Sequence, residues 1–374
     1  MTTPVPRTNQ RLGESGAGTR LRVGFITHLD QHDDPATIYR ENIRLIQELE
    51  GIGFDSAWIA TRHFHSGFAA LPSPFAFYGA AAAATSTIHL GTAVLPLLVD
   101  DPVRDAEEAA ALDHLSGGRL QLGLGKGVPS DAYHVFSRWG GEREAEYDEK
   151  TDRLRWALAG NRVPDSNSSI WPRNEELLGR LYHGTSNWET IRRAARNGDG
   201  FILERFGNGE ERTPEARPKF LRRQADSIIE YRRVFRETWG DSRTPYVVLS
   251  RSAWPGGLEE LGRTTERWNE LARAYGRVPA GLDTAGEALS DNVIWGDPEE
   301  LAQRFIEDDP SVLLADELVL GIHPTHHTID ETVERARVLF ERTVPIVAAE
   351  WLRRRARLDA TFEEWQIDGE WVRA

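Results

Sequence analysis

The sequence predicts a (β/α)8 TIM barrel of the α/β class, with insertions and a C-terminal helical extension. Eight short apolar runs occur along the chain, and most of them are followed by an amphipathic helical pattern. Alternation repeated this often favours a closed barrel over an open doubly wound sheet. The length of 374 residues is also typical of one such barrel with insertions.

Eight apolar runs are the candidate strands. They are LRVGFIT from Leu21, SAWIA from Ser56, LGTAVLP from Leu90, RLQLGLG from Arg119, RLYHG from Arg180, GFILE from Gly200, PYVVLS from Pro245 and ELVLG from Glu317. Helical spacing of apolar residues predicts helices near residues 38–49, 74–85, 103–113, 187–197, 218–239, 298–307 and 329–342. Most strands are thus followed by a helix, as a parallel sheet requires.

Residues 90–127 carry the strongest signal. Two largely apolar runs flank a helical pattern, and we expect both runs to be strands that are covered on both faces. Gly123, Gly125 and Gly127 follow at every second position where the second strand ends. Because these residues lack a Cβ atom, a ligand could lie against bare backbone there.

The remaining segments define the expected organisation. We expect a disordered tail over residues 1–20, a barrel over 21–345 with insertions near 163–174 and 253–293, and an extension over 346–374. The second insertion carries its own helical pattern over 258–275. Trp351, Trp365 and Trp371 in the extension are expected to cap the core, with dimerisation as the alternative.

Composition excludes several classes of chemistry. The chain has no cysteine, so disulfides, thiolate metal sites and a cysteine nucleophile are absent. A net charge of −14 argues against a nucleic-acid surface. No apolar run approaches the roughly 20 residues that span a bilayer, and the first twenty residues lack the apolar centre of a secretion signal. We therefore expect no membrane contact and a cytoplasmic location.

The pattern over residues 90–127 resembles that of the bacterial luciferase-like flavin-dependent monooxygenases. The match covers GTAV with LP, then PVR, AE, LD and LSGGR, and finally GLGKG. The resemblance implies a (β/α)8 barrel that uses reduced FMN or, in some branches, the deazaflavin F420. It also implies a small organic substrate, O2 and a homo-oligomer, most simply a dimer. Because no nicotinamide-binding GxGxxG motif follows a strand, a separate flavin reductase is expected.

The loop over residues 60–74 resembles the AEHHF element of that family, whose two histidines line the reactive side of the flavin. His63 matches the second histidine, and His65 follows it after Phe64. Arg62 stands where the first histidine is usual, and a guanidinium cannot shuttle protons at neutral pH. The resemblance implies catalytic roles for His63 and His65 at this loop. Arg62 is expected to act there by stabilising an anionic reduced flavin or a substrate carboxylate. The alternative is that the two histidines are hydrogen-bonded loop residues.

The resemblance also implies a cofactor floor and a phosphate site. Thr92, Ala93, Val94 and Pro96 would lie under the flavin ring, where family members often have a strained, sometimes cis, peptide. Lys126, within GLGKGV, would bind the phosphate as a cation beside glycine amides. The alternative for Lys126 is a solvated side chain.

A second phosphate contact is implied where the segment from Tyr182 to Gly200 resembles the family's GGSSPETARRAARLGDG element. The residues expected there are Gly184, Thr185, Ser186 and Thr190, at the start of the helix over 187–197, where exposed amides favour an anion. Either Ser186 or Asn187 is expected to cap this helix. An ordinary N-cap explains Ser186 equally well.

Three histidines follow the last strand in GIHPTHH, namely His323, His326 and His327. They raise the possibility of zinc, but no HxH follows the first strand and no acid at a strand end completes a set. We therefore expect no metal, and a place for His323 near the substrate or flavin.

Four functions remain open from the sequence. The first is an FMN-dependent monooxygenase that uses O2, and the second is an F420-dependent oxidoreductase that transfers hydride. The third is a flavin-binding barrel without turnover, which the substitution at Arg62 keeps open, and the last is a metal-dependent hydrolase. The substrate is not predicted, because it depends on variable loops.

Overall fold

The structure is a computed structural model that describes residues 20–29, 34–64, 71–127, 131–136, 142–206, 211–274, 279–322 and 328–358. The chain divides into two compact units. One contains Thr27–Thr185, and the other contains Ser186–Ala374 together with most of the first strand. The tail expected over 1–20 lies outside the described residues except for Arg20.

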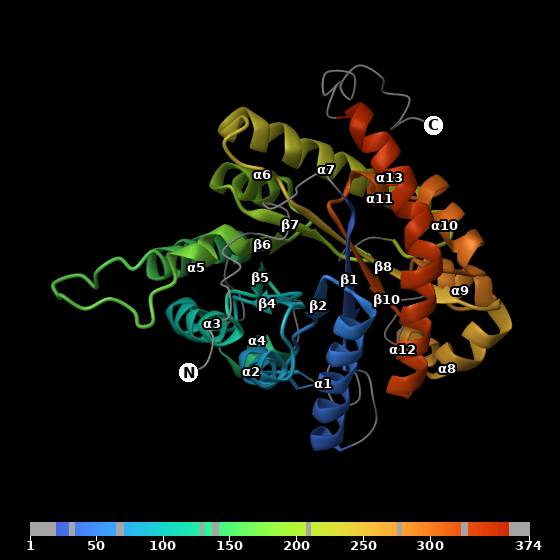
Figure 1. The fold of residues 1–374 in the computed structure, drawn as a ribbon, viewed down its shortest axis with the longest axis horizontal. Helices are drawn as coiled ribbons and strands as arrows, with labels where there is room; N and C mark the ends of the chain where they lie inside the picture. The colour runs from blue at the N-terminus through green and yellow to red at the C-terminus, as the bar shows by residue number, and fades with distance from the viewer. Residues whose placement is uncertain are drawn as a thin grey trace. The chain divides into compact units, whose positions relative to one another are not determined.

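The first unit alternates parallel strands with helices (Figure 1). Its strands are β2 (Ser56–Ile59), β3 (His89–Thr92), β4 (Leu95–Pro96), β5 (Leu120–Gly125) and β6 (Leu181–Gly184). Its helices are α1 (Pro35–Ile52), α2 (Pro74–Ala84), α3 (Pro102–Ser116), α4 (Asp131–Val135), α5 (Arg143–Leu158) and the 3-10 helix η1 (Glu175–Arg180). Asp34 and Asp101 cap α1 and α3 by accepting hydrogen bonds from backbone amides of the first turn. Pro35 and Pro102 follow these caps, at a position where the missing amide costs nothing.

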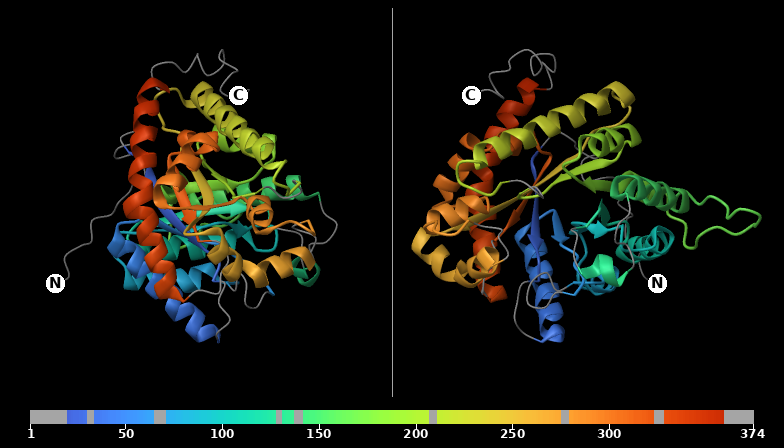
Figure 2. Two further views of the ribbon diagram at one scale, coloured as in Figure 1. Left: turned by 90° about the vertical axis from the view of Figure 1, so that its right-hand side faces the viewer. Right: turned by 180° about the vertical axis from the view of Figure 1, so that it is seen from behind.

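The second unit also alternates strands with helices. Its strands are β1 (Arg22–Thr27), β7 (Gly200–Leu203), β8 (Val247–Pro255), β9 (Val293–Gly296) and β10 (Glu317–Gly321). Its helices are α6 (Trp188–Asn197), α7 (Arg217–Trp239), α8 (Leu258–Ala274), α9 (Thr284–Ser290), α10 (Pro298–Glu307), α11 (Pro310–Leu314), α12 (Ile329–Val338) and α13 (Val344–Leu358). The helix expected over 329–342 ends at Val338, where the chain continues as the π-helical turn η2 (Leu339–Thr343). Figure 2 shows α12, η2 and α13 as one continuous helical stretch.

The strand order confirms the predicted barrel class. The strands follow one another as β10-β1-β2-β3-β5-β6-β7-β8, and β10 also pairs with β8. The pairings within each unit are parallel, as in the registers Trp58↔Gly91 and Phe201↔Val247. Eight parallel strands in this cyclic order, connected by helices, are a (β/α)8 barrel.

Two segments extend beyond the minimal barrel. The chain between α5 and η1 forms a long excursion from the first unit (Figure 1, green), and it carries Trp171, which is 82% exposed. In the second unit, the last residues of β8 pair with β9, and α8 and α9 lie between these two strands in the sequence. Trp254 and Val293 belong to a hydrophobic cluster of their own there. β9 is a strand that the sequence did not predict.

Trp351 caps the core of the second unit, as expected for the extension. Its side chain is fully buried, and its indole N–H donates to the carbonyl of Ala315 at 2.7 Å. Trp365 and Trp371 lie outside the described residues.

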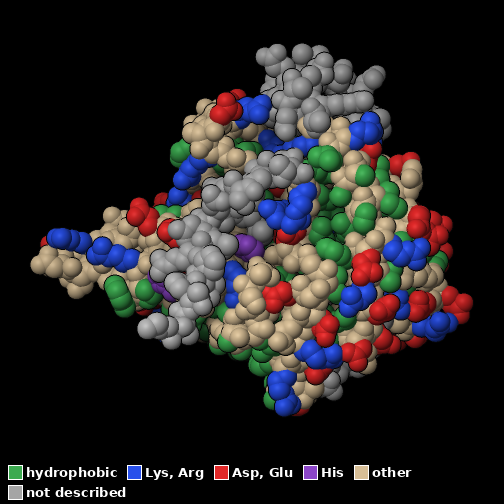
Figure 3. Space-filling model, viewed as in Figure 1, with side chains coloured by type: hydrophobic (Ala, Val, Ile, Leu, Met, Phe, Trp, Pro, Cys, Tyr) green, Lys and Arg blue, Asp and Glu red, His purple; other side chains and the backbone are tan. Residues whose placement is uncertain are grey.

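Two further observations concern the charge of the surface and the hydrophobicity of the helices. Acidic side chains are interspersed with basic ones over α8 to α10 (Figure 3). Among the described residues, no helix combines the length and apolarity that crossing a bilayer would need.

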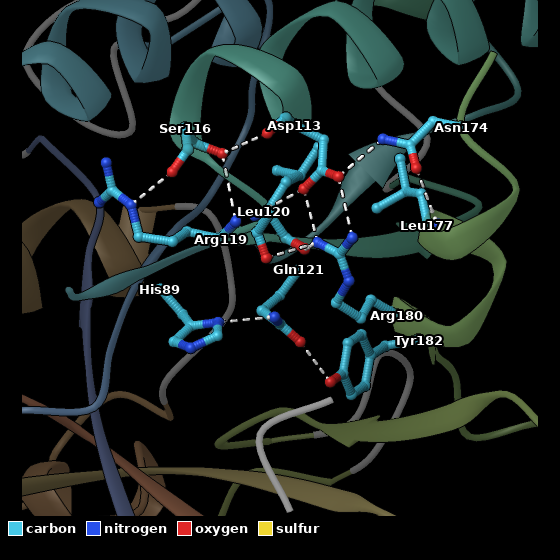
Figure 4. Close-up of polar contacts among 11 residues, drawn as sticks. His89, Asp113, Ser116, Arg119, Leu120, Gln121, Asn174, Leu177, Arg180 and Tyr182 are labelled. Atoms are coloured by element: carbon cyan, nitrogen blue, oxygen red, sulfur yellow. Dashed lines mark hydrogen bonds and ion pairs between the residues drawn. The ribbon is translucent and has the colours of Figure 1, made fainter. Parts of the chain in front are cut away.

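A buried polar network links strands and helices of the first unit (Figure 4). Tyr182 donates its hydroxyl hydrogen to Gln121 Oε1 at 2.5 Å, and Gln121 Nε2 donates to His89 Nδ1 at 2.8 Å. These three side chains come from β6, β5 and β3. The network satisfies polar atoms that burial would otherwise leave unpaired, and it fixes the strands that lead to the candidate site.

Candidate functional site

The loop after β2 presents His63 among aromatic rings. His63 is half-buried, and its ring centroid lies 5.0 Å from that of Phe136 and 6.1 Å from that of Phe64. The centroids of the Phe64 and Phe136 rings lie 5.8 Å apart. Phe64 is 59% exposed and Phe136 is 37% exposed. Phe64 has a φ of 60°, a left-handed conformation that is strained for a bulky residue. Phe64, Phe136 and His63 therefore form an aromatic cluster at the carboxyl end of β2.

Among the described residues, the buried Nε2 atom of His63 has no hydrogen-bond partner. A buried polar nitrogen of this kind costs free energy until a ligand or water supplies a partner. Burial raises the pKa of the nearby Asp100 carboxyl, and the charge of His63 opposes that rise. Arg62 is half-buried and its amide donates to the carbonyl of Leu71, which anchors the loop, whereas His65 lies outside the described residues.

The segment after β3 forms a small apolar platform. The peptide between Ala93 and Val94 is cis, and both residues are half-buried. A Cβ atom on Gly125 would lie 2.3 Å from a Val94 methyl group, and one on Gly184 would lie 2.7 Å from the other methyl. The two glycines, at the ends of β5 and β6, thus let Val94 settle directly on the strands. Thr92 is fully buried and donates its hydroxyl to the carbonyl of Gly123 at 2.8 Å, so it holds the strands together rather than presenting a side chain at the platform.

Lys126 follows β5 and already has an acidic partner. Its Nζ atom lies 2.5 Å from Oε1 of Glu144 in the first turn of α5. The Lys126 side chain is 17% exposed and that of Glu144 is 55% exposed. The cation that the sequence predicts is therefore present at the end of β5, and it is engaged with a carboxylate.

Arg143 is a candidate phosphate ligand that the sequence did not predict. Its Nη2 atom donates to the carbonyl of Gly127 at 2.7 Å and to the hydroxyl of Tyr133 at 3.1 Å, and its guanidinium lies 5.2 Å from the centre of the Tyr133 ring. The Tyr133 hydroxyl in turn donates to the carbonyl of Lys126 at 2.6 Å. Among its contacts with described residues, Arg143 has no carboxylate partner. It brings a second positive charge to the glycine-rich turn after β5.

Backbone chemistry explains how this turn is held. Tyr133 and Arg143 occupy the carbonyls of Lys126 and Gly127, and Gly127 has a φ of 69°, a conformation that favours glycine. No spacing rule connects Arg143 with the GLGKG motif. The one signal in the sequence was an arginine at the start of a charged helical stretch, which is common on solvated surfaces.

The start of α6, in the second unit, is capped by Asn187. The Asn187 side chain accepts from the amides of Glu189 and Thr190 at 2.9 and 3.1 Å. Thr190 is buried and its hydroxyl donates to the same Asn187 oxygen at 3.4 Å. Ser186 is exposed in the turn before the helix, and Thr185 before it is half-buried. Of the two expected caps, the structure therefore selects Asn187, which leaves Ser186 outside the capping interaction.

The three histidines after β10, at positions 323, 326 and 327, lie outside the described residues. Within the described part of the chain, no group of three or more histidine or acidic side chains could hold a metal ion.

Comparison with known proteins identifies the family. The model of the luciferase-like monooxygenases matches residues 21–309. A 4-hydroxyprotoasukamycin monooxygenase of Streptomyces nodosus subsp. asukaensis is 36% identical over 104 residues, which are 28% of each chain. An F420-dependent glucose-6-phosphate dehydrogenase of Beutenbergia cavernae is 34% identical over 175 residues, 43% of this chain and 51% of that protein. An uncharacterised protein of Sinorhizobium fredii is 30% identical over 189 residues, 48% and 55% of the two chains.

The chain thus spans about half, or less, of the length of these curated relatives. Solved structures share the fold over a longer range. The monooxygenase RslO1 of Streptomyces bottropensis superposes with a TM-score of 0.67 over 88% of this chain and 100% of its own, at 20% identity. The oxygenating constituent of 3,6-diketocamphane monooxygenase of Pseudomonas putida, solved with FMN, gives 0.64 over 87% and 98%, at 15% identity. Because the family model covers most of its length, this chain belongs to the luciferase-like monooxygenase family.

Proposed function

We propose that this oxidoreductase is an FMN-dependent monooxygenase that oxygenates a small organic substrate. The observation that carries the proposal is the pair of cations, Lys126 and Arg143, at the glycine-rich turn that ends β5. In a chain of net charge −14, two cations at one glycine-rich turn fit a phosphorylated ligand. Thr185, Ser186 and Thr190, at the start of α6, are proposed as further phosphate contacts. Gly184 is proposed to serve cofactor binding through Val94, which lies against it.

The platform would support the ring of the cofactor. Ala93 and Val94 are half-buried and apolar, so the apolar face of a flat heterocycle could lie against them. Gly125 and Gly184 let Val94 lie directly against the ends of β5 and β6, because any side chain at either position would displace Val94. Thr92 supports the platform from below through its bond to Gly123.

The aromatic cluster would bind substrate and exclude water. Phe64 and Phe136 expose apolar ring surface beside His63, which is suited to an apolar substrate. The unpartnered Nε2 of His63 could accept or donate one proton at the reacting group. Arg62 cannot share that task at neutral pH, and we propose that it stabilises negative charge on the reduced cofactor or on the substrate.

Reduced FMN supplies two electrons, with which one oxygen atom of O2 enters the substrate and the other leaves as water. The protein's part is to bind, orient and shield the reactants. A separate reductase that uses NADH would deliver the reduced flavin, and a cytoplasmic location and a homodimer belong to the same proposal.

F420 is the second candidate cofactor. It is favoured by the match to an F420-dependent dehydrogenase, which at 175 residues is longer than the match to the Streptomyces monooxygenase. With F420 the same site would transfer hydride and would not use O2. Fold and phosphate contacts are shared, so cofactor binding itself must separate the two.

The test is a titration of the purified protein with FMN and with F420, followed by spectroscopy. Reductase, NADH and a panel of small apolar compounds are then added under labelled oxygen. Binding of FMN and transfer of one labelled oxygen atom to a compound are expected. Binding of F420 alone, with hydride transfer, would replace the first candidate by the second. Binding of FMN without turnover of any compound would favour a flavin-binding barrel that lacks catalysis.

A further inference from the structure

We propose that Glu144 competes with the phosphate of the cofactor for Lys126, and that it thereby keeps the bound flavin exchangeable. The inference rests on the proposed function, because it assumes a phosphorylated cofactor at the end of β5. It adds a residue whose role is to limit affinity and to discriminate FMN from phosphate-free flavin.

The geometry of the ion pair sets up the competition. The distance of 2.5 Å between Lys126 Nζ and Glu144 Oε1 is that of a direct charge-assisted hydrogen bond. Any phosphate on Lys126 would need the same ammonium group. The Lys126 side chain is 17% exposed and has little freedom to turn elsewhere, whereas Glu144 is 55% exposed and can move into water. The ammonium has three N–H donors, but a phosphate that shared it with Glu144 would be repelled by the carboxylate. Movement of Glu144 into water would remove that repulsion and leave the full charge of Lys126 to the phosphate.

The neighbouring Arg143 provides the contrast. It is held by the Gly127 carbonyl and by Tyr133, both uncharged, and no carboxylate of the described residues contacts it. The positive charge of Arg143 is therefore available to an anion, whereas the positive charge of Lys126 is neutralised by Glu144. Two adjacent residues of one helix turn, Arg143 and Glu144, act on the site in opposite directions.

Charge balance indicates the consequence. Lys126, Arg143 and Glu144 sum to one positive charge, while a phosphomonoester carries about −1.5 to −2 at neutral pH. Neutralising Glu144 would raise the local sum to two and match the phosphate. The acid therefore weakens the binding of FMN without affecting a flavin that lacks the phosphate. Weak binding suits a flavin that arrives from a reductase and leaves again after each turnover.

Glu144 also has a purely structural interpretation. It lies in the first turn of α5, where an acid stabilises the helix through the helix dipole. A helix-stabilising role would make its substitution affect all ligands alike. The experiment must therefore separate an effect on phosphate from an effect on the helix.

The test compares Glu144→Gln with the wild-type protein for two ligands, FMN and riboflavin, by quenching of flavin fluorescence. We expect FMN to bind about tenfold more tightly to E144Q, the size of one removed charge contact at a partly buried site, and riboflavin to bind within twofold of wild type. The unchanged riboflavin affinity also shows that the variant is folded. Glu149→Gln is the matched control, since Glu149 is an exposed acid of the same helix and its substitution changes the net charge equally.

A double-mutant cycle tests the competition for Lys126 directly. In a Lys126→Met background, E144Q should improve FMN binding by about twofold or less, because the contested ammonium is gone. A full tenfold gain in that background would overturn the inference. So would an equal gain for riboflavin, or an equal gain from E149Q. Failure of both wild type and E144Q to bind FMN would instead overturn the proposed function.

Discussion

Arg180 and Asp113 form a buried, two-pronged ion pair in the first unit (Figure 4). Arg180 Nη1 donates to Asp113 Oδ1 at 2.5 Å, and Nη2 donates to Oδ2 at 2.8 Å. The same carboxylate accepts from the Leu120 amide and from Asn174 Nδ2. One side chain of α3 thereby joins the start of β5 to the segment that leads into β6. Asp113 belongs to the LD element of the family pattern, and its role in this structure is to hold strands together.

Breaking this pair should destabilise the protein strongly. Asp113→Asn or Arg180→Met would leave one buried partner without its counter-charge, so the free energy of unfolding should fall by about 3 to 5 kcal/mol. Urea denaturation measures the change. Arg104→Met is the matched control. Arg104 lies on α3, like Asp113, and forms an ion pair with Glu108, but its side chain is 68% exposed. Loss of this pair should lower the free energy of unfolding by less than about 1 kcal/mol. Equal losses for Arg180 and Arg104 would contradict this account.

The fold could be predicted from the sequence where several local signals indicate the same secondary structure. The segment from β3 to β5 has apolar strands, an acidic cap at Asp101 and a glycine at Gly117 that ends α3, and each signal points to the same structure. The helix α5 gave no such agreement. Its sequence is dense in charge, and it buries Lys150, whose Nζ donates to the carbonyls of Leu97, Leu98 and Asp100. Because these carbonyls lie about 50 residues away in the sequence, the hydrophobic periodicity of the helix does not indicate that Lys150 is buried.

The sequence could propose candidate site residues only where they follow one another within one segment. Lys126 follows its motif along the chain, and resemblance to the family indicated it. Arg143, Glu144 and Tyr133 reach the same turn from other elements, and side-chain geometry decides their contacts. The sequence likewise predicted the small residues of the platform, but not that Val94 would rest on Gly125 and Gly184.

Asp105 should make stability fall as pH rises. Burial, followed by repulsion from Asp100 and Glu108, raises its pKa to about 8 from an ordinary value of 3.8. The folded state therefore holds a proton that the unfolded state releases, and stability declines between about pH 4 and pH 8 and is unaffected below pH 4.

The variant Asp105→Asn cannot ionise and should remove this decline. At pH 8.5 it should be more stable than wild type by about 2 to 5 kcal/mol, and near pH 4 the two should match. Urea denaturation at both pH values checks the difference. A constant gap between the proteins at the two pH values would show that the carboxyl titrates normally.

Gly125→Ala should be destabilising through a clash with Val94. The new Cβ atom would lie 2.3 Å from the Val94 methyl group, so the platform must shift, at a cost of about 1 to 3 kcal/mol. In the double variant Gly125→Ala, Val94→Ala the clash is removed, and the combined loss should be smaller than the sum of the two single losses. Gly79→Ala in α2 is the control, since nothing lies within 4 Å of its new Cβ, and it should stabilise the protein by about 0.5 to 1 kcal/mol.

Arg143 should contribute to binding of the phosphate and not of the ring. Arg143→Met removes the charge that faces the turn after β5, and FMN should bind about tenfold more weakly, with riboflavin nearly unchanged. Arg143→Lys should recover part of the loss, because an ammonium keeps the charge but not the fork that holds the Gly127 carbonyl. Isothermal titration calorimetry with both flavins measures these effects. Equal weakening of riboflavin would assign Arg143 to the shape of the turn alone.

His63 should govern turnover with little effect on the affinity for flavin. His63→Phe keeps an aromatic ring in the cluster with Phe64 and Phe136, and it removes the unpartnered Nε2 atom. If that nitrogen moves a proton at the reacting group, kcat for the compound that supports turnover should fall about a hundredfold or more, while the Kd for FMN stays within threefold. His63→Ala should show the same loss of kcat and, in addition, lower stability, because among the described residues Phe136 loses one of its two ring contacts and keeps only that with Phe64. A His63→Phe enzyme with unchanged kcat would show that His63 serves only to pack the aromatic cluster, and the proton would have to come from another group at this end of the barrel.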